Sequence, residues 1–167
     1  MNGKTRRTAV LAATLVLLLT CAASVRAAEN PISWSTAGIP RKALPSGAKF
    51  SVKLIARIDA GWHLYAQQQE EGGPIPTEIS LADQPVFTLG SVRASKPIEL
   101  LDPNFNKRVG LYIETAEFSL PLTVVSGAPE GSQHAPIQVR YQCCNETMCL
   151  PPRTAIVDLA VSIKAQR

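Results

Sequence analysis

The sequence has 167 residues, the size of one ordinary domain, with 17 lysines and arginines against 13 aspartates and glutamates. Four of the basic residues lie before Ala28 in a stretch without acidic residues, and the remainder carries 13 basic and 13 acidic residues. This balance argues against a nucleic-acid-binding domain and against a polybasic membrane-surface domain, because both need a surplus of Lys and Arg on one face.

The first 27 residues have the features of a secretory signal peptide. A cationic start at residues 4–7 precedes an apolar run at residues 9–19 and small residues up to Ala27, after which we expect cleavage. The apolar run is shorter than the roughly 20 residues that span a bilayer. A retained anchor is the alternative, and lipid attachment at Cys21 fits less well. We therefore expect a signal peptide at 1–27 and an exported, periplasmic domain at 28–167.

Alternating apolar and polar residues predict β-strands through most of that domain. In chain order, strands are expected at residues 50–58, 62–66, 77–81, 87–94, 116–124, 137–141 and 155–163, with turn residues between them. Sustained helical periodicity is not found beyond the leader. The pattern predicts an all-β fold, an immunoglobulin-like antiparallel β-sandwich of about seven to nine strands.

The cysteines of the predicted domain are gathered near its end, because Cys143, Cys144 and Cys149 lie within seven residues. A structural disulfide stabilises a protein most when it closes a long loop, and these cysteines close a very short one. The clustering therefore indicates thiol chemistry or metal binding rather than a structural staple.

The strand that leads to the cysteines assigns them to opposite faces. Residues 137–141 place apolar side chains on one face, which Cys143 continues, whereas Cys144 follows the polar residues. We expect Cys143 to be buried and Cys144 to be accessible to solvent. Cys149 follows a short polar loop, so Cys144 and Cys149 are expected at the tip of a hairpin, where their sulfurs can approach bonding distance.

The residues alone leave several functions open. A reversible Cys144–Cys149 disulfide suits thiol–disulfide exchange, whereas a static bridge suits a non-enzymatic binding module. Cys143 is either an inert buried thiol or a competing thiol for Cys149. A Cu(I)-binding domain is the remaining alternative, although adjacent cysteines on opposite faces do not readily bind one ion; its ligands would come from Cys143, Cys144, Cys149, Met148, His63 and His134.

Three segments carry a resemblance to a known family. They are residues 139–152 (VRYQCCNETMCLPP), residues 61–65 with 72–77 (GWHLY and GGPIPT), and residues 102–105 (DPNF) ahead of Tyr112. In this order they resemble the N-terminal periplasmic domain of the thiol:disulfide interchange protein DsbD. The resemblance extends from about Trp34 to Ile163 and is most specific in the cysteine segment.

The resemblance implies an immunoglobulin-like component of a protein-disulfide reductase, or thiol–disulfide oxidoreductase, with neither cofactor nor metal. Cys144 and Cys149 would be its redox pair, and Cys149 would form the mixed disulfide with a partner. Phe105 would be a cap that covers the disulfide and excludes small thiols and oxidants, with Tyr65 and His63 beside it.

Two positions differ from the family pattern. Cys143 replaces a small residue and introduces the competing thiol, and Asp102 lies one step further from the cap aromatic than the acidic residues of well-known members.

The implied partners are thioredoxin-fold periplasmic proteins. Because the sequence ends at Arg167, before any membrane-spanning segment, we expect a separate membrane electron donor of the DsbD type. We expect no nucleic acid partner and no stable membrane insertion after signal cleavage.

Overall fold

The computed structural model describes residues 30–164, so the predicted signal peptide at 1–27 and Cys21 lie outside the described residues. These residues form strands and loops without a helix, which confirms the predicted all-β class. The strands are β1 (Ile32–Ala37), β2 (Lys49–Ile58), β3 (His63–Tyr65), β4 (Glu78–Leu81), β5 (Phe87–Leu89), β6 (Arg93–Ala94), β7 (Ile98–Asp102), β8 (Lys107–Tyr112), β9 (Thr115–Val124), β10 (Gly131–Tyr141), β11 (Cys143–Cys144) and β12 (Arg153–Ile163).

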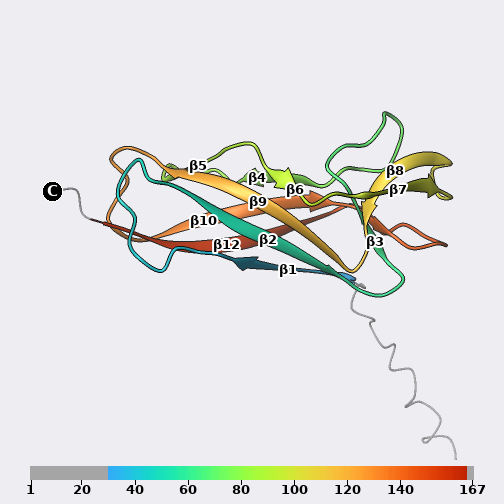
Figure 1. The fold of residues 1–167 in the computed structure, drawn as a ribbon, viewed down its shortest axis with the longest axis horizontal. Coiled ribbons are helices and arrows are strands. Elements are labelled where there is room, and N and C mark those ends of the chain that lie inside the picture. Colours follow the sequence, from blue (N-terminus) through green and yellow to red (C-terminus); the bar gives the residue numbers. More distant parts are fainter. Residues whose placement is uncertain (1–29, 165–167) are drawn as a thin grey trace, which may run out of the picture.

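Two antiparallel sheets form the sandwich (Figure 1). One sheet has the order β1-β2-β9-β5, with β6 also paired to β9, and the other has the order β12-β10-β4. β10 and β12 pair without a break from Gly131 opposite Ile163 to Tyr141 opposite Arg153. This long hairpin crosses the sandwich and leads directly to the cysteines.

The sandwich forms because alternate residues of its long strands are apolar. β9 buries Ala116, Phe118, Leu120, Leu122 and Val124, and β10 buries every second residue from Ala135 to Tyr141. Successive side chains of a strand point to opposite faces, so this alternation gives each sheet one apolar inner face. The two inner faces meet in a single large core that also includes Cys143.

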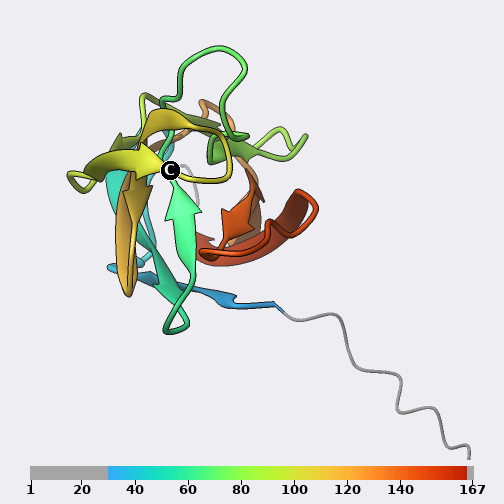
Figure 2. The same ribbon diagram turned by 90° about the vertical axis from the view of Figure 1, so that its right-hand side faces the viewer.

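A third sheet closes one end of the sandwich and carries the cysteines. Its order is β11-β3-β8-β7, and we call it the end sheet. Figure 2 views the molecule from this end, with the β7–β8 hairpin and the cysteine-bearing turn projecting toward the reader. Gly110 in β8 permits the close packing here, since an added Cβ would lie 3.3 Å from the Cβ of Ala66 and 3.5 Å from Pro97.

The structure has more strands than expected. Residues 87–94 form two strands, β5 and β6, because their partner β9 contains Pro121, whose nitrogen cannot donate to the ladder. β1, β7, β8 and the two-residue strand β11 were not predicted as separate strands. β7 has four exposed residues before the buried Asp102, so its sequence lacks the alternation of a half-buried strand.

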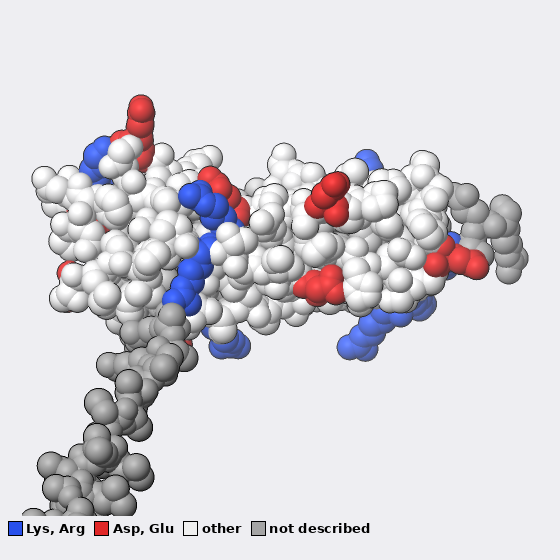
Figure 3. Space-filling model, turned by 180° about the vertical axis from the view of Figure 1, so that it is seen from behind, with Lys and Arg blue, Asp and Glu red and all other residues white. Residues whose placement is uncertain are grey.

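Charged side chains are scattered over the surface. On the face in Figure 3, acidic and basic side chains lie in small groups, several of which contain both signs, with broad uncharged surface between the groups. This distribution agrees with the balanced charge of the sequence. No helix within residues 30–164 is long and apolar enough to cross a membrane.

Two isoleucines test the assignment of inner and outer faces. Ile137 of β10 is fully buried, whereas Ile156 of β12 is 67% exposed. We expect Ile137→Ala to lower the free energy of unfolding by about 2–5 kcal/mol, because it leaves a cavity between the sheets. Ile156→Ala is the matched control and is expected to cost less than about 1 kcal/mol. Urea unfolding measures both, and equal losses would contradict the described core.

Candidate functional site

The strand pairing of the end sheet decides where the cysteines point. In the β11–β3 register, Cys143 lies opposite Leu64 and Cys144 opposite His63. Because neighbouring residues alternate between faces, Cys143 and Leu64 point into the sandwich core, and Cys144 and His63 point to the other face. The predicted assignment of the two cysteines to opposite faces is therefore confirmed.

The predicted accessibility of Cys144 is wrong, because its exposed fraction is 0%. The outer face of the end sheet is covered by a second apolar cluster, which we call the outer cluster. It consists of Tyr65, Val109, Leu111 and Cys144, with Phe105 and Cys149 packed against it. The β7–β8 hairpin supplies this cover. Because the sequence pattern did not predict these two strands, Cys144 was expected to face solvent.

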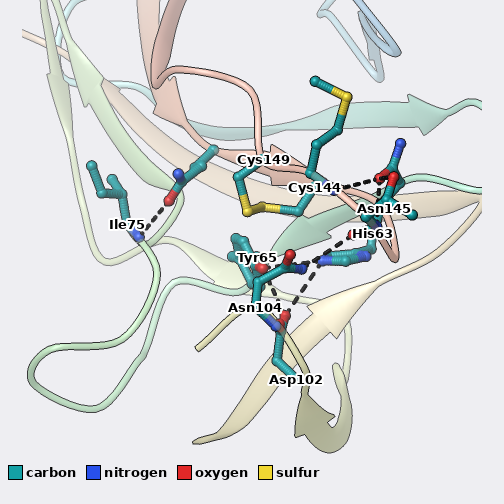
Figure 4. The surroundings of a disulfide bond; sticks show 11 residues. His63, Tyr65, Ile75, Asp102, Asn104, Cys144, Asn145 and Cys149 are labelled. Carbon is teal, nitrogen blue, oxygen red and sulfur yellow. Dashed lines mark hydrogen bonds and ion pairs between the residues drawn. A yellow bond between two sulfur atoms is a disulfide. The ribbon is translucent and has the colours of Figure 1, made fainter. Parts of the chain in front are cut away.

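Cys144 and Cys149 form a disulfide with their Cα atoms 4.0 Å apart. Between them, residues 145–148 form a turn that we call the disulfide loop. The Asn145 side chain accepts hydrogen bonds from the backbone nitrogens of Thr147 and Met148, both at 2.9 Å. The Asn145 nitrogen donates to the Met148 oxygen at 2.9 Å. These bonds bend the chain back, so Cys149 returns to Cys144 at the tip of the hairpin, as Figure 4 shows.

Cys149 is the more accessible residue of the pair, because it is partly exposed while Cys144 is fully buried. Cys143 is the free cysteine of the described residues, with an exposed fraction of 1%. Burial raises the pKa of the Cys143 thiol to about 11, against a smaller opposite effect of Arg153. A thiol in this state is a poor nucleophile at neutral pH.

The cap loop, residues 103–106, connects β7 to β8 and carries Phe105 over the outer cluster. The Phe105 ring meets the Tyr65 ring edge-on, with the ring centroids 5.9 Å apart. Asn106 has a φ of 51°, a left-handed conformation that asparagine tolerates, and it turns the chain back into β8. Phe105 itself is partly buried, so it lies at the boundary between the cluster and solvent.

A buried carboxylate anchors this loop. Asp102 has an exposed fraction of 0%, and its two oxygens accept hydrogen bonds of 2.7 Å from the Tyr65 hydroxyl and from the Asn104 nitrogen. The His63 Nε2 lies 3.5 Å from the same oxygen that Tyr65 contacts. Hydrogen bonds of this kind offset the cost of removing a carboxylate from water. Asp102 thus fixes both the start of the cap loop and the Tyr65 ring.

The ring nitrogen of His63 and the Tyr65 hydroxyl are 3.1 Å apart. Burial lowers the pKa of the His63 imidazole below its usual 6.5, although the Asp102 carboxylate acts in the opposite direction. Burial and the hydrogen bond to Asp102 raise the pKa of the Tyr65 hydroxyl. At neutral pH, therefore, Tyr65 is protonated and His63 is largely uncharged.

A direct hydrogen bond joins the cap loop to the disulfide loop. The Asn104 side-chain nitrogen donates to the backbone carbonyl oxygen of Asn145 at 3.1 Å (Figure 4). Gln142 holds a third segment in place, because its side chain accepts a hydrogen bond of 3.0 Å from the Ile75 nitrogen. The sequence reasoning missed Asn104, Asn145 and Gln142. For Asn145 a signal was present, since an asparagine that opens a short polar loop favours a turn in which its side chain bonds the backbone two residues on.

The structure thus brings His63, Tyr65, Asp102 and Phe105 around Cys144 and Cys149, and it places Cys143 on the opposite face. Another residue from the sequence analysis, His134, lies elsewhere, in β10, where it pairs with Asp158. Within residues 30–164, His, Cys, Asp and Glu side chains do not form a group of three that could hold a metal ion.

The state of Cys143 gives a first prediction for the site. A thiol with a pKa of about 11 is ionised to roughly one part in a thousand at pH 8. We therefore expect iodoacetamide at pH 8 to leave Cys143 unmodified in the folded protein and to modify it in denaturant, as measured by peptide mass. Modification at the same rate in both states would contradict the described burial.

The Asn104–Asn145 hydrogen bond gives a second prediction. An exposed hydrogen bond contributes about 0.5–1.5 kcal/mol, so Asn104→Ala should make cap opening, and reduction of the disulfide by dithiothreitol, roughly two- to tenfold faster. Gln133→Ala is the matched control, since it removes an amide bond to the Glu130 oxygen far from the cap. Equal reduction rates for the wild type and Asn104→Ala would show that this bond does not hold the cap.

Comparisons with known proteins agree with the resemblance seen in the sequence. Residues 34–161 match the family described as thiol:disulfide interchange protein DsbD, N-terminal. A search of curated proteins finds no match. The reduced N-terminal domain of DsbD from Neisseria meningitidis has a similar fold, with 22% identity and a TM-score of 0.50 over 70% of this chain and 82% of that chain.

A second solved structure, the N-terminal periplasmic domain of ScsB from Proteus mirabilis, aligns at 14% identity with a TM-score of 0.41, covering 81% of this chain and 51% of that chain. The family match is the decisive finding, because it extends over most of the sequence and includes all three segments that carried the resemblance. The chain therefore belongs to the family formed by the N-terminal domains of the thiol:disulfide interchange protein DsbD.

Proposed function

We propose that this domain exchanges electrons with thioredoxin-fold proteins through a reversible Cys144–Cys149 disulfide, in the periplasm after export by the leader at residues 1–27. The observation that carries the proposal is the disulfide itself: a short ring at a hairpin tip, with one cysteine partly exposed and the other buried under a cap. Family membership supports the same chemistry.

Accessibility supports Cys149 as the sulfur that partners attack. A partner thiolate forms a bond with the Cys149 sulfur while the Cys144–Cys149 bond breaks, and Cys144 leaves as a thiolate that takes up a proton. A second thiol of the same partner then attacks the partner sulfur of the mixed disulfide, and Cys149 leaves as a thiolate that takes up a proton. The partner is released as a disulfide and the domain as a dithiol. The reverse sequence oxidises the dithiol and reduces a partner.

The surroundings of the disulfide favour a protein partner over a small substrate. A pocket of about 660 Å³ lies beside the end sheet, but no cysteine lines it; its walls include Ala66, Gln69, Lys96, Glu99, Arg108 and Gly110. The disulfide instead lies in the turn that follows β11, where it packs against Phe105 of the cap loop. A partner surface that displaces Phe105 would reach Cys149, so the cap would select partners by shape.

The asymmetry of the pair is tested by trapping. We expect Cys144→Ala, which leaves the partly exposed Cys149, to form a stable mixed disulfide with a thioredoxin-fold protein. Cys149→Ala, which leaves the buried Cys144, should form little, and Cys143→Ala is the control that should behave as the wild type does. Gel analysis without reductant measures the adduct. A stronger adduct for Cys149→Ala would reverse the proposed roles.

A redox titration in glutathione buffers separates this function from a structural bridge. The proposal expects one two-electron couple at Cys144 and Cys149, and a dithiol form that keeps the native near-UV circular dichroism spectrum. Loss of the fold on reduction, or a bond that glutathione cannot open, would instead support a static disulfide.

A further inference from the structure

The burial of Cys144 creates a requirement for proton transfer, provided that the proposed exchange takes place. Each cycle adds a proton to Cys144 or removes one, yet its exposed fraction is 0% and its neighbours Val109 and Leu111 are apolar. An isolated thiolate in such a place is costly, because burial favours the neutral form of a thiol. Water reaches this sulfur poorly, so a neighbouring side chain that can accept and return a proton would speed the exchange.

His63 is placed for this task. It is the direct cross-strand partner of Cys144 in the β3–β11 pair, and such partners have Cβ atoms about 4.5–5.5 Å apart. The His63 side chain is 14% exposed, so one part of the imidazole lies at the buried site and another part can exchange protons with water. Figure 4 shows the ring beside the disulfide, on the side of Asn145.

The hydrogen bonds around His63 determine which of its nitrogens is basic. The Tyr65 hydroxyl donates its hydrogen to Asp102, so toward His63 the Tyr65 oxygen acts as an acceptor. Nε2 of His63 therefore carries the hydrogen, and Nδ1 is the nitrogen that can accept a proton.

The charged and titratable groups near His63 come from three strands. Tyr65 lies on its own strand, Asp102 on β7 and Cys144 on β11, and the loop residues Asn104 and Asn145 nearby are neutral. Asp102 favours the protonated ring and burial disfavours it, with burial the larger effect. The ring is thus neutral at pH 7 and ready to accept a proton, and Asp102 stabilises it once it has done so.

We propose that His63 is the proton acceptor and donor for Cys144 during thiol–disulfide exchange. In ring closure, the Cys144 sulfur attacks the mixed disulfide at Cys149, the Cys144–Cys149 bond forms, and the bond from Cys149 to the partner sulfur breaks. The partner leaves as a thiolate, and the proton of Cys144 passes to Nδ1 of His63 and from there to water. In the opposite direction the protonated ring returns a proton to the departing Cys144 thiolate.

The test uses the two histidines of the sequence as a matched pair. The fully reduced protein is mixed with oxidised glutathione at rising concentrations, until intramolecular ring closure limits the rate of disulfide formation. The reaction is stopped with acid, the products are measured by mass spectrometry, and the experiment is repeated between pH 5 and 8. We expect the wild-type rate to fall as pH decreases through the pKa of His63, below 6.5.

His63→Gln should close the ring at least about tenfold more slowly at pH 7 and should lose that inflection. His134→Gln, which removes an exposed imidazole paired with Asp158 away from the site, should retain the wild-type rate and pH profile. Identical rates and profiles for His63→Gln and the wild type would overturn the proposal.

A second measurement applies even if His63→Gln does not fold. In the His134→Gln protein, the one remaining imidazole is titrated by NMR in the disulfide and dithiol forms. The proposal expects the pKa of His63 to differ between these forms, because the ring faces Cys144, and equal values would overturn it. If neither protein forms a reversible Cys144–Cys149 couple, the proposed function fails; if the couple is intact and insensitive to His63, only this inference fails.

Discussion

The pairing of the two-residue strand β11 with β3 is the constraint on which the site depends. It fixes Cys143 and Cys144, adjacent in sequence, on opposite faces of the end sheet. One face closes the sandwich core, and the other is closed by the outer cluster and the cap loop. A shift of one residue in this register would exchange the two cysteines and place the disulfide partner in the core.

Asp102 connects this pairing to the cap. Its carboxylate is completely buried yet contacts Tyr65 on β3, the backbone of Asn104 in the cap loop and, more distantly, His63. A buried carboxylate with directed partners is costly to rearrange, so the Tyr65 ring and the base of the cap loop form one rigid unit. Movement of the cap is therefore expected in the Asn104 side chain, Phe105 and Asn106, and not in the Asn104 backbone nitrogen that Asp102 holds. The site therefore combines a rigid base, formed by Asp102 and Tyr65, with a cap loop that weaker contacts hold over the disulfide.

Much of the fold follows from the sequence, because the long strands β2, β9, β10 and β12 alternate strictly and bury one face. The burial of Cys143 follows from the same alternation. The cover over Cys144 did not follow from periodicity, because β7 has exposed apolar residues and β8 contains Gly110, so neither matches a simple pattern. Only the family resemblance indicated a cap at Phe105. The contacts of Asn104 and Asn145 depend on two loops meeting in space, which no local pattern of residues reveals.

The turn built on Asn145 has a consequence for the lifetime of intermediates. Its hydrogen bonds to Thr147 and Met148, together with the one from the Leu150 nitrogen to the Cys143 oxygen at 3.0 Å, do not require the sulfur–sulfur bond. In the dithiol form these bonds would keep Cys149 near Cys144, which gives each thiol a high effective molarity toward the other. Covalent adducts with a partner would then be short-lived, and the domain would release its partners quickly.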